Sequence, residues 1–155
     1  MSAERPRFGL DTNILIYAVE AGAGEKGCRA EEVVRRAVAT RRCMLTLQNL
    51  GEFYAACVRK RMGEPGAVAA RADDLARLFP TAAASLDDVR LALAEAAAGH
   101  FSYWDALLLA TLGRAGCAVL LSEDMQEGVT LAGVTVRNPL AGDRLPEAIE
   151  ALLAS

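Results

Sequence analysis

The sequence predicts an α/β fold, specifically a three-layer α/β/α sandwich built around a mainly parallel sheet. Three observations support this prediction. Short apolar segments of strand length recur along the chain, stretches with helical periodicity alternate with them, and single strands spaced in this way are not hairpins. Strands joined through helices need crossover connections, which make the strands parallel and place helices on both faces of the sheet.

The predicted strands are short and apolar. They cover residues 7–10, 43–47, 81–84, 117–121 and 134–136. The segment 81–84 is the weakest of these predictions, because its three alanines have little preference for the strand conformation.

Helices are predicted where apolar residues repeat at i, i+3 and i+4. Such stripes cover 30–38, 50–58 and 68–79, and the last of these lies between Pro65 and Pro80. Ser85 is the expected N-cap of a helix that ends near Gly99. Residues 106–112 are apolar on almost every side, which predicts a helix buried all round, and 145–153 form a last amphipathic helix.

Length and composition predict one domain over residues 1–155. The chain is long enough to bury its own core, and no linker, repeat or low-complexity tract divides it. Its four cysteines form no C-x-x-C pair, which argues against a zinc site and favours free thiols in a reducing cytosol. We find no signal peptide and no apolar run long enough to span a bilayer, so we expect a cytoplasmic protein.

The formal charge of −3 argues against a generic basic nucleic-acid binder. That conclusion depends on where the acids lie. If four of the twenty acidic residues belong to one metal site, the other sixteen against seventeen Lys and Arg leave +1. A nearly neutral shell around an acidic pocket filled by metal is compatible with a polyanionic substrate.

Four acidic residues lie near the predicted start of a helix or end of a strand. Asp11 directly follows the first strand, and Asp124 comes three residues after the apolar run 118–121. Glu52 lies in the opening turns of the helix after 43–47, and Asp105 opens the buried helix. In an open parallel sheet, ligands bind outside the carboxyl ends of the strands.

Each acid also has a purely structural interpretation. Asp11 fits the N-cap of the next helix, and Ser102 with Asp105 fits the outline of a capping box. Glu52 taken alone is best explained as a solvated surface residue, and Asp124 as a turn former. For Asp105 the functional interpretation is stronger, because an unpaired carboxylate at the mouth of a buried helix is costly.

The combination of the four acids favours a shared site. Carboxylates from four segments would form an acidic pocket that repels itself unless a cation is bound. Oxygen ligands without histidine or thiolate match Mg²⁺ or Mn²⁺, and such an ion can supply water for phosphodiester hydrolysis. Asn13 and Ser122 are expected to orient a water molecule, a carboxylate or the scissile phosphate.

The stretches "LDTNILIYA", "LGEFYAA", "SYWDALLLATLGRAGC" and "LLSEDMQEG" together resemble the PIN-domain family. Within that family the resemblance is greatest to the toxin ribonucleases of VapBC-type toxin–antitoxin pairs, and it extends over about residues 8–139. It implies a Rossmann-like sheet, binding of Mg²⁺ or Mn²⁺ and endonucleolytic cleavage of RNA. By position, the acidic quartet of the family corresponds to Asp11, Glu52, Asp105 and Asp124, and its polar companions to Asn13 and Ser122.

The resemblance also implies partners. Toxins of this kind typically form homodimers and are neutralised by a small VapB-like antitoxin that covers the active-site groove. The region 63–99 has no distinctive motif, so the choice of RNA substrate cannot be inferred from it.

Two other functions stay open at this point. A phosphohydrolase of the haloacid-dehalogenase type also has an aspartate after its first strand, but it needs a second aspartate where this chain has Asn13. A non-catalytic PIN-like module that binds RNA is the other alternative. The roles of His100, Tyr103 and Trp104 are open, and the run Arg59-Lys60-Arg61 fits either phosphate contacts or a solvated helix end.

Overall fold

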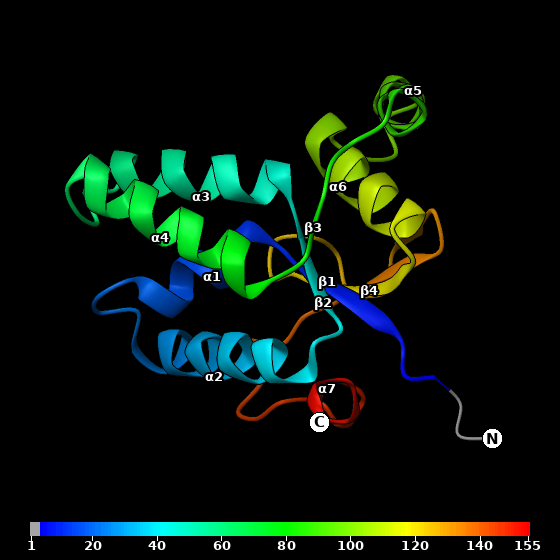
Figure 1. The fold of residues 1–155 in the computed structure, drawn as a ribbon. Coiled ribbons are helices and arrows are strands. Elements are labelled where there is room, and N and C mark those ends of the chain that lie inside the picture. The colour runs from blue at the N-terminus through cyan, green and yellow to red at the C-terminus, as the bar shows by residue number, and fades with distance from the viewer. Residues whose placement is uncertain (1–3) are drawn as a thin grey trace.

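The computed structural model describes residues 4–155 and confirms the α/β sandwich with a mainly parallel sheet (Figure 1). Six strands follow the spatial order β3-β2-β1-β4-β6-β5. Their bounds are β1 Arg7–Leu10, β2 Cys43–Thr46, β3 Thr81–Ala82, β4 Cys117–Leu121, β5 Thr130–Leu131 and β6 Val134–Arg137. All neighbouring strands are parallel except β5 and β6, which are antiparallel.

The strand predictions were correct in position and differ at three ends. The second strand stops at Thr46, because Thr46 is the N-cap of the next helix and its side chain accepts a hydrogen bond from the Asn49 N–H. The segment 81–84 contributes only the edge strand β3, Thr81–Ala82, whereas the last strand runs one residue further, to Arg137. Strand β5 was not predicted, since two residues are too few for a periodic pattern.

Seven helices connect and cover the strands of the described chain. They are α1 Thr12–Val19, α2 Gly24–Thr40, α3 Leu47–Arg59, α4 Pro65–Leu78, α5 Leu86–Ala97, α6 Tyr103–Arg114 and α7 Glu147–Leu153. Ser85 is the N-cap of α5, as its sequence predicts, and it forms a full capping box with Asp88.

Two large apolar cores lie on opposite faces of the sheet, and a smaller one lies between α5 and α6. Phe8, Leu10 and Leu121 point toward the side of α2 and α7, where the larger core lies. Leu120 and Val136 point to the opposite side and pack with α6. Every residue from Ala106 to Leu112 of α6 is buried, which confirms the prediction of a helix enclosed on all sides.

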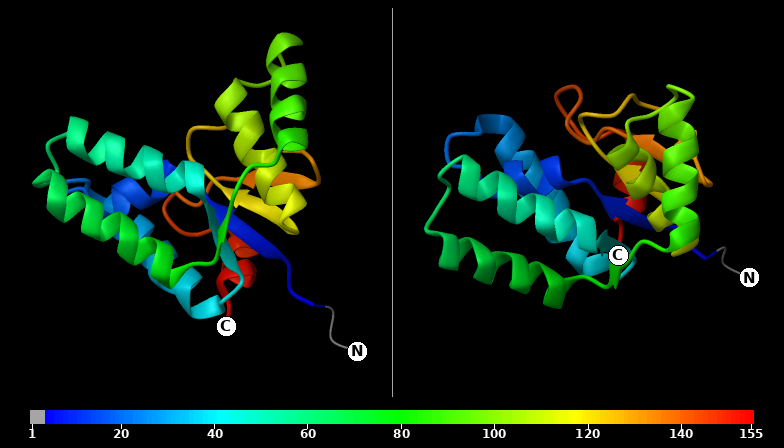
Figure 2. Two further views of the ribbon diagram at one scale, coloured as in Figure 1. Left: turned by 45° about the horizontal axis from the view of Figure 1, so that its top comes forward. Right: turned by 90° about the horizontal axis from the view of Figure 1, so that it is seen from above.

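The helices also form two pairs that diverge from the sheet. Figures 1 and 2 show α3 beside α4 and α5 beside α6, and both pairs pack closely. Between these pairs lie the carboxyl ends of β1, β2 and β4, so the acids predicted at those ends have a common place to meet.

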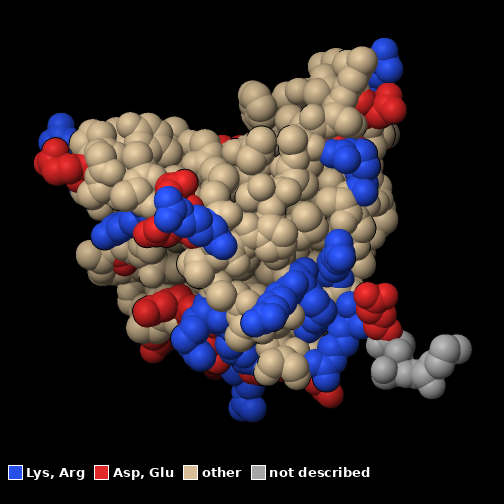
Figure 3. All heavy atoms as spheres, in the orientation of Figure 1, with Lys and Arg blue, Asp and Glu red and all other residues tan. Residues whose placement is uncertain are grey.

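Basic side chains join the two ends of the described chain. Lys and Arg gather around the N-terminal segment on the face shown in Figure 3. Arg42 donates to the carbonyl oxygens of Pro6, Leu152 and Ala154 at 2.7–3.0 Å, and Arg5 donates to Ala154 O at 2.8 Å. The bonds to Leu152 and Ala154 satisfy carbonyls at the end of the short helix α7, where intrahelical partners are missing. Among residues 4–155, no helix is long and apolar enough to cross a membrane.

Candidate active site

The candidate site lies where the strand order reverses. Within the sheet, β2 and β3 lie on one side of β1, and the later strands β4 and β6 lie on its other side. The central strands β1 and β4 therefore end side by side, and the Asp11 N–H donates to Leu121 O at 2.9 Å. This topological switch point is where open parallel sheets bind ligands.

All four predicted acids line one cavity of about 340 Å³ at this position. They come from four segments: the end of β1, helix α3, the start of α6 and the loop after β4. The lining residues are Asp11, Thr12, Asn13, Ile16, Glu52, Ala55, Ala56, Arg59, Asp105 and Asp124. The structure thus brings together the four acids and Asn13, while Ser122 lies directly behind them.

Asp11 combines a structural role with a place in the cavity. It is the N-cap of α1, and its Oδ1 accepts a hydrogen bond from the Thr12 N–H at 2.7 Å. Its Oδ2 accepts from the buried Ser122 hydroxyl at 2.8 Å and from Asn13 Nδ2 at 3.4 Å. The two predicted polar companions therefore orient this carboxylate directly.

Glu52 is fixed by neighbours rather than solvated, which corrects the surface role expected for it alone. Its Oε2 accepts from the Thr12 hydroxyl at 2.8 Å, and its Oε1 accepts from Gln48 Nε2 at 2.7 Å. Asn49, which is fully buried, donates to the same Thr12 hydroxyl at 3.2 Å and forms the capping box of α3 with Thr46. The start of α3 and the carboxylate of Glu52 are thus held by one connected network.

Asp105 and Asp124 have fewer constraints. The Asp105 N–H donates to the Ser102 hydroxyl at 3.2 Å, which is the first half of the expected capping box. Its carboxylate lines the cavity. Asp124 is exposed, in a loop held by Glu123, whose Oε1 accepts from Tyr17 and from Lys26 at 3.0 and 2.9 Å.

Crowding of the acids alters their proton affinities. Burial raises the pKa of Asp11 from an ordinary 3.8 to about 6, and repulsion from Asp105 and Glu52 adds to this effect, although the bonds from Ser122 and Thr12 oppose it. Burial also raises the pKa of Asp105, with repulsion from Glu52 and Asp124 contributing. A pocket that disfavours its own ionised carboxylates is stabilised by a cation.

The donor chemistry of the cavity fits a hard divalent cation. Among the described residues, its lining offers carboxylate, hydroxyl and amide oxygens, with Arg59 as the one basic side chain and no histidine or cysteine. None of the ion pairs formed within residues 4–155 involves Asp11, Glu52, Asp105 or Asp124. In the same residues, no group of three His, Cys, Asp or Glu side chains is already close enough to share one ion.

The network that fixes Glu52 was missed by the sequence prediction. Thr12, Gln48 and Asn49 carry no charge, and their partners lie up to forty residues away in the chain. Two local signals were available. Thr46-x-x-Asn49 has the spacing of a capping box, and Gln48 stands one helical turn before Glu52.

His100, Tyr103 and Trp104, whose roles the sequence left open, do not line the cavity. The His100 ring pairs with Glu95 at 3.0 Å on the surface. Tyr103 packs against the small core between α5 and α6, whereas Trp104 is 60% exposed and meets Tyr103 edge to face.

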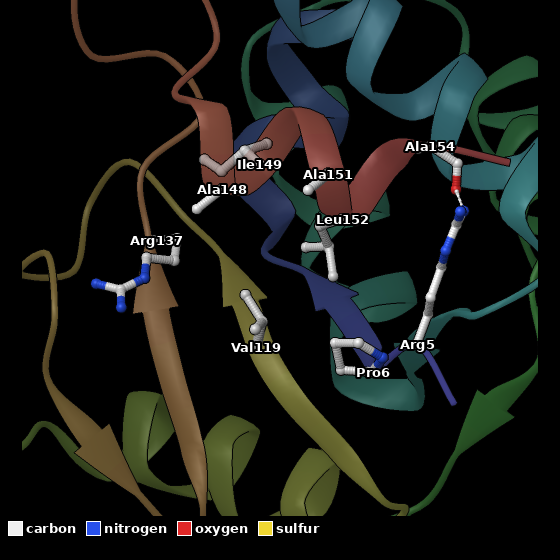
Figure 4. Close-up of a pocket in the computed structure, with 9 residues that line it drawn as sticks. All are labelled: Arg5, Pro6, Val119, Arg137, Ala148, Ile149, Ala151, Leu152 and Ala154. Atoms are coloured by element: carbon white, nitrogen blue, oxygen red, sulfur yellow. Dashed lines mark hydrogen bonds between the residues drawn. The ribbon is translucent and has the colours of Figure 1, made fainter. Parts of the chain in front are cut away.

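A larger groove of about 610 Å³ lies between α7 and strands β4 and β6, as Figure 4 shows. It is mostly apolar, and among residues 4–155 its charged lining side chains are two arginines that already have hydrogen-bond partners. Arg5 donates to the C-terminal carbonyls and Arg137 to Glu127. Since no carboxylate, thiol or imidazole of the described residues lines this groove, the smaller acidic cavity is the candidate site.

Comparison with known proteins supports the fold. No family model and no curated protein sequence matches the chain. Among solved structures, the chain is similar to VapC20 of Mycobacterium tuberculosis, a toxin that cleaves the sarcin–ricin loop. That match has a TM-score of 0.60 and 24% identity, over 76% of this chain and 89% of VapC20. It is also similar to a chain of FitAB bound to an IR36 DNA fragment, with a TM-score of 0.66 and 16% identity, over 88% of this chain and 98% of that one. The topology and these two similarities show that the chain has the PIN-like α/β/α fold that its motifs predict.

Proposed function

We propose that this protein is an endoribonuclease dependent on Mg²⁺ or Mn²⁺ and the toxin of a VapBC-type toxin–antitoxin pair. The observation that carries the proposal is one cavity lined by four carboxylates, none of which forms an ion pair within residues 4–155. The resemblance of the motifs to PIN-domain toxins and the structural similarity to VapC20 support the same conclusion.

Asp11, Glu52, Asp105 and Asp124 are the residues proposed to hold the ion. Mg²⁺ keeps several of its waters and needs only one or two carboxylates as direct ligands, so it suits acids that line a cavity without forming a closed shell. When bound, the ion supplies charge stabilisation at a scissile phosphate and activates water for attack.

The protein itself supplies orientation. Ser122 and Asn13 fix Asp11, while Thr12 and Gln48 fix Glu52, so both carboxylates keep their positions as a polyanion enters. The proton on Asp11 must leave before this carboxylate can bind a cation. Activity should therefore rise as pH passes through the pKa of about 6.

The partner part of the proposal is a VapB-like antitoxin and a homodimer of this chain. Its support is the resemblance to the VapBC-type toxins together with the similarity to FitAB. We expect expression of this chain alone to halt growth, and co-expression of the protein encoded next to it to restore growth. Growth unaffected by the chain alone would count against a toxin.

The direct test is cleavage of cellular RNA by the purified chain in Mg²⁺ or Mn²⁺, with sequencing of the RNA ends. Asp11→Asn and Asp105→Asn should abolish cleavage, and chelation should do the same. Asp73→Asn is the matched control, because Asp73 pairs with Arg77 on the exposed surface of α4. Full cleavage by either active-site variant would refute the proposal.

Two other outcomes would point to the alternative functions. A phosphorylated Asp11 would indicate a phosphohydrolase. Binding of RNA without cleavage in either metal, over a range of substrates, would indicate a non-catalytic module.

A further inference from the structure

One face of α3 runs from the acidic cavity to its rim. Glu52, Ala55, Ala56 and Arg59 all line the cavity, and their spacing places them on the same side of the helix. Arg59 lies seven positions after Glu52, which corresponds to about 10 Å along the helix axis. The two alanines between them are small, so the path from the carboxylates to the guanidinium stays open.

The three basic residues of the run 59–61 have different surroundings in the structure. Lys60 is paired with Glu20 at 3.0 Å. Arg61 follows the end of α3, with a backbone φ of 55°, and does not line the cavity. Arg59 lines the cavity, and within residues 4–155 its side chain makes neither an ion pair nor a hydrogen bond.

Two simpler explanations account only in part for an unpaired Arg59 that lines the acidic cavity. A cation in the last turn of a helix interacts favourably with the helix dipole, but that effect does not require the side chain to line a cavity. An arginine that served to neutralise the acids would be paired with one of them. Arg59 shares their cavity without such a pair, so its donors are available to an external anion.

We propose that Arg59 forms a second subsite that binds a phosphate of the RNA backbone next to the phosphate being cleaved. This inference rests on the proposed function, since it assumes that a nucleic-acid strand enters the acidic cavity. A guanidinium presents donors in a planar fork that matches phosphate oxygens, which makes arginine suited to this task. The subsite would hold the strand in register along α3 while the carboxylates act on the neighbouring phosphate.

Binding of a fluorescent single-stranded RNA, followed by anisotropy at several salt concentrations, tests the subsite. The measurement uses the full chain in an Asp11→Asn background, so that the probe is not cut. Arg59→Gln should weaken binding about tenfold and reduce the slope of log K against log salt by about 0.7. Arg59→Lys should recover part of the affinity, because it keeps the charge but loses the fork.

Arg61→Gln is the matched control, since it removes a neighbouring exposed charge that does not line the cavity. Thermal unfolding of each variant checks that the fold is intact. In the cleavage assay, Arg59→Gln should raise KM with little change in kcat, as expected when uniform binding is lost.

The outcomes separate the two proposals. Equal binding by the Arg59→Gln and Arg61→Gln variants, or no measurable binding of RNA, overturns the subsite even if the wild type cleaves RNA. A tenfold loss confined to Arg59→Gln supports the subsite even if no cleavage is found, in which case the proposed nuclease function fails alone.

Discussion

The Asp11 side chain both caps a helix and lines the acidic cavity, so folding and the proposed function can use the same residue. One carboxylate oxygen caps α1, and the other accepts a hydrogen bond from the Ser122 hydroxyl at the edge of the cavity. The sequence left capping and catalysis as competing explanations for this aspartate. The structure makes them compatible, because the two oxygens face different partners.

Asp11→Asn should make the cation-free protein more stable at pH 8. The pKa of Asp11 is about 6 when folded and 3.8 ordinarily, so the folded state binds its proton more tightly. Stability from this group is therefore fully present below pH 3.8 and is lost as pH rises to about 6. The loss amounts to about 3 kcal/mol.

An asparagine cannot ionise, so the variant avoids this loss and its advantage should vanish near pH 4. Chemical denaturation in a chelating buffer at pH 4 and pH 8 measures the difference. If wild type and variant show the same change in stability between the two pH values, Asp11 does not have the raised pKa that we describe.

Thr12→Val should damage activity through Glu52. Valine keeps the shape of threonine but loses the hydroxyl that donates to Glu52 and accepts from Asn49. We expect a 10- to 100-fold loss in activity or metal affinity, as is typical when a group that orients a ligand is removed. Leaving the buried Asn49 amide without this acceptor should also cost about 1–3 kcal/mol of stability.

Thr12→Ser restores the hydroxyl and is the control for Thr12→Val. It should recover most of the activity, which a purely steric role of the threonine methyl would not allow. The affinity for Mn²⁺, measured by calorimetry on both variants, tests the positioning role separately from folding. Equal Mn²⁺ affinities of Thr12→Val and Thr12→Ser would exclude the positioning role.

Most helices and strands could be predicted from local sequence patterns. The stripes at 30–38, 50–58 and 68–79 gave α2, α3 and α4, because each helix buries one apolar face. What could not be predicted depends on contacts between distant segments. Strand β5 exists only because it pairs with β6, and Gln48 reaches both Glu52 and the carbonyl of Trp104.

Gly113 and Gly51 test the packing of these elements as a matched pair. Both are helical, but a side chain at Gly113 would collide with the backbone of Ala132 in the β5–β6 turn, whereas Gly51 has open space around it. Gly113→Ala should therefore destabilise the protein by about 1–3 kcal/mol, since the fixed backbone contact must shift. Gly51→Ala should stabilise it by about 0.5–1 kcal/mol through helix propensity.

Urea denaturation of both glycine variants gives the comparison directly. Because Gly113 lies on α6, its substitution should also loosen the turn between β5 and β6 without changing residues that line the cavity. Equal effects of the two substitutions would show that α6 does not approach the turn as closely as described.

For the whole molecule, the important consequence of the topology is that the four acids meet in one cavity. Asp11 and Asp124 follow the neighbouring strands β1 and β4, so a parallel sheet brings them to one edge. Their convergence was predictable from the sequence for that reason. The approach of Glu52 and Asp105 depends on how α3 and α6 diverge from the sheet, which no local pattern specifies.

A divalent cation should stabilise the whole fold, and more at high pH than at low pH. Mg²⁺ at a hundred times its dissociation constant adds about 2.7 kcal/mol to the free energy of unfolding. At pH 8 Asp11 is ionised and repelled by its neighbours, so a cation relieves that repulsion, whereas below its pKa of about 6 a proton competes for the same oxygens.

Thermal unfolding with Mg²⁺, and with NaCl at equal ionic strength, separates specific binding from screening. The shift in Tm should be largest for wild type at pH 8, small for Asp11→Asn and unchanged for Asp73→Asn, which alters an exposed pair on α4. A shift of equal size in all three proteins would place the bound cation somewhere other than the acidic cavity.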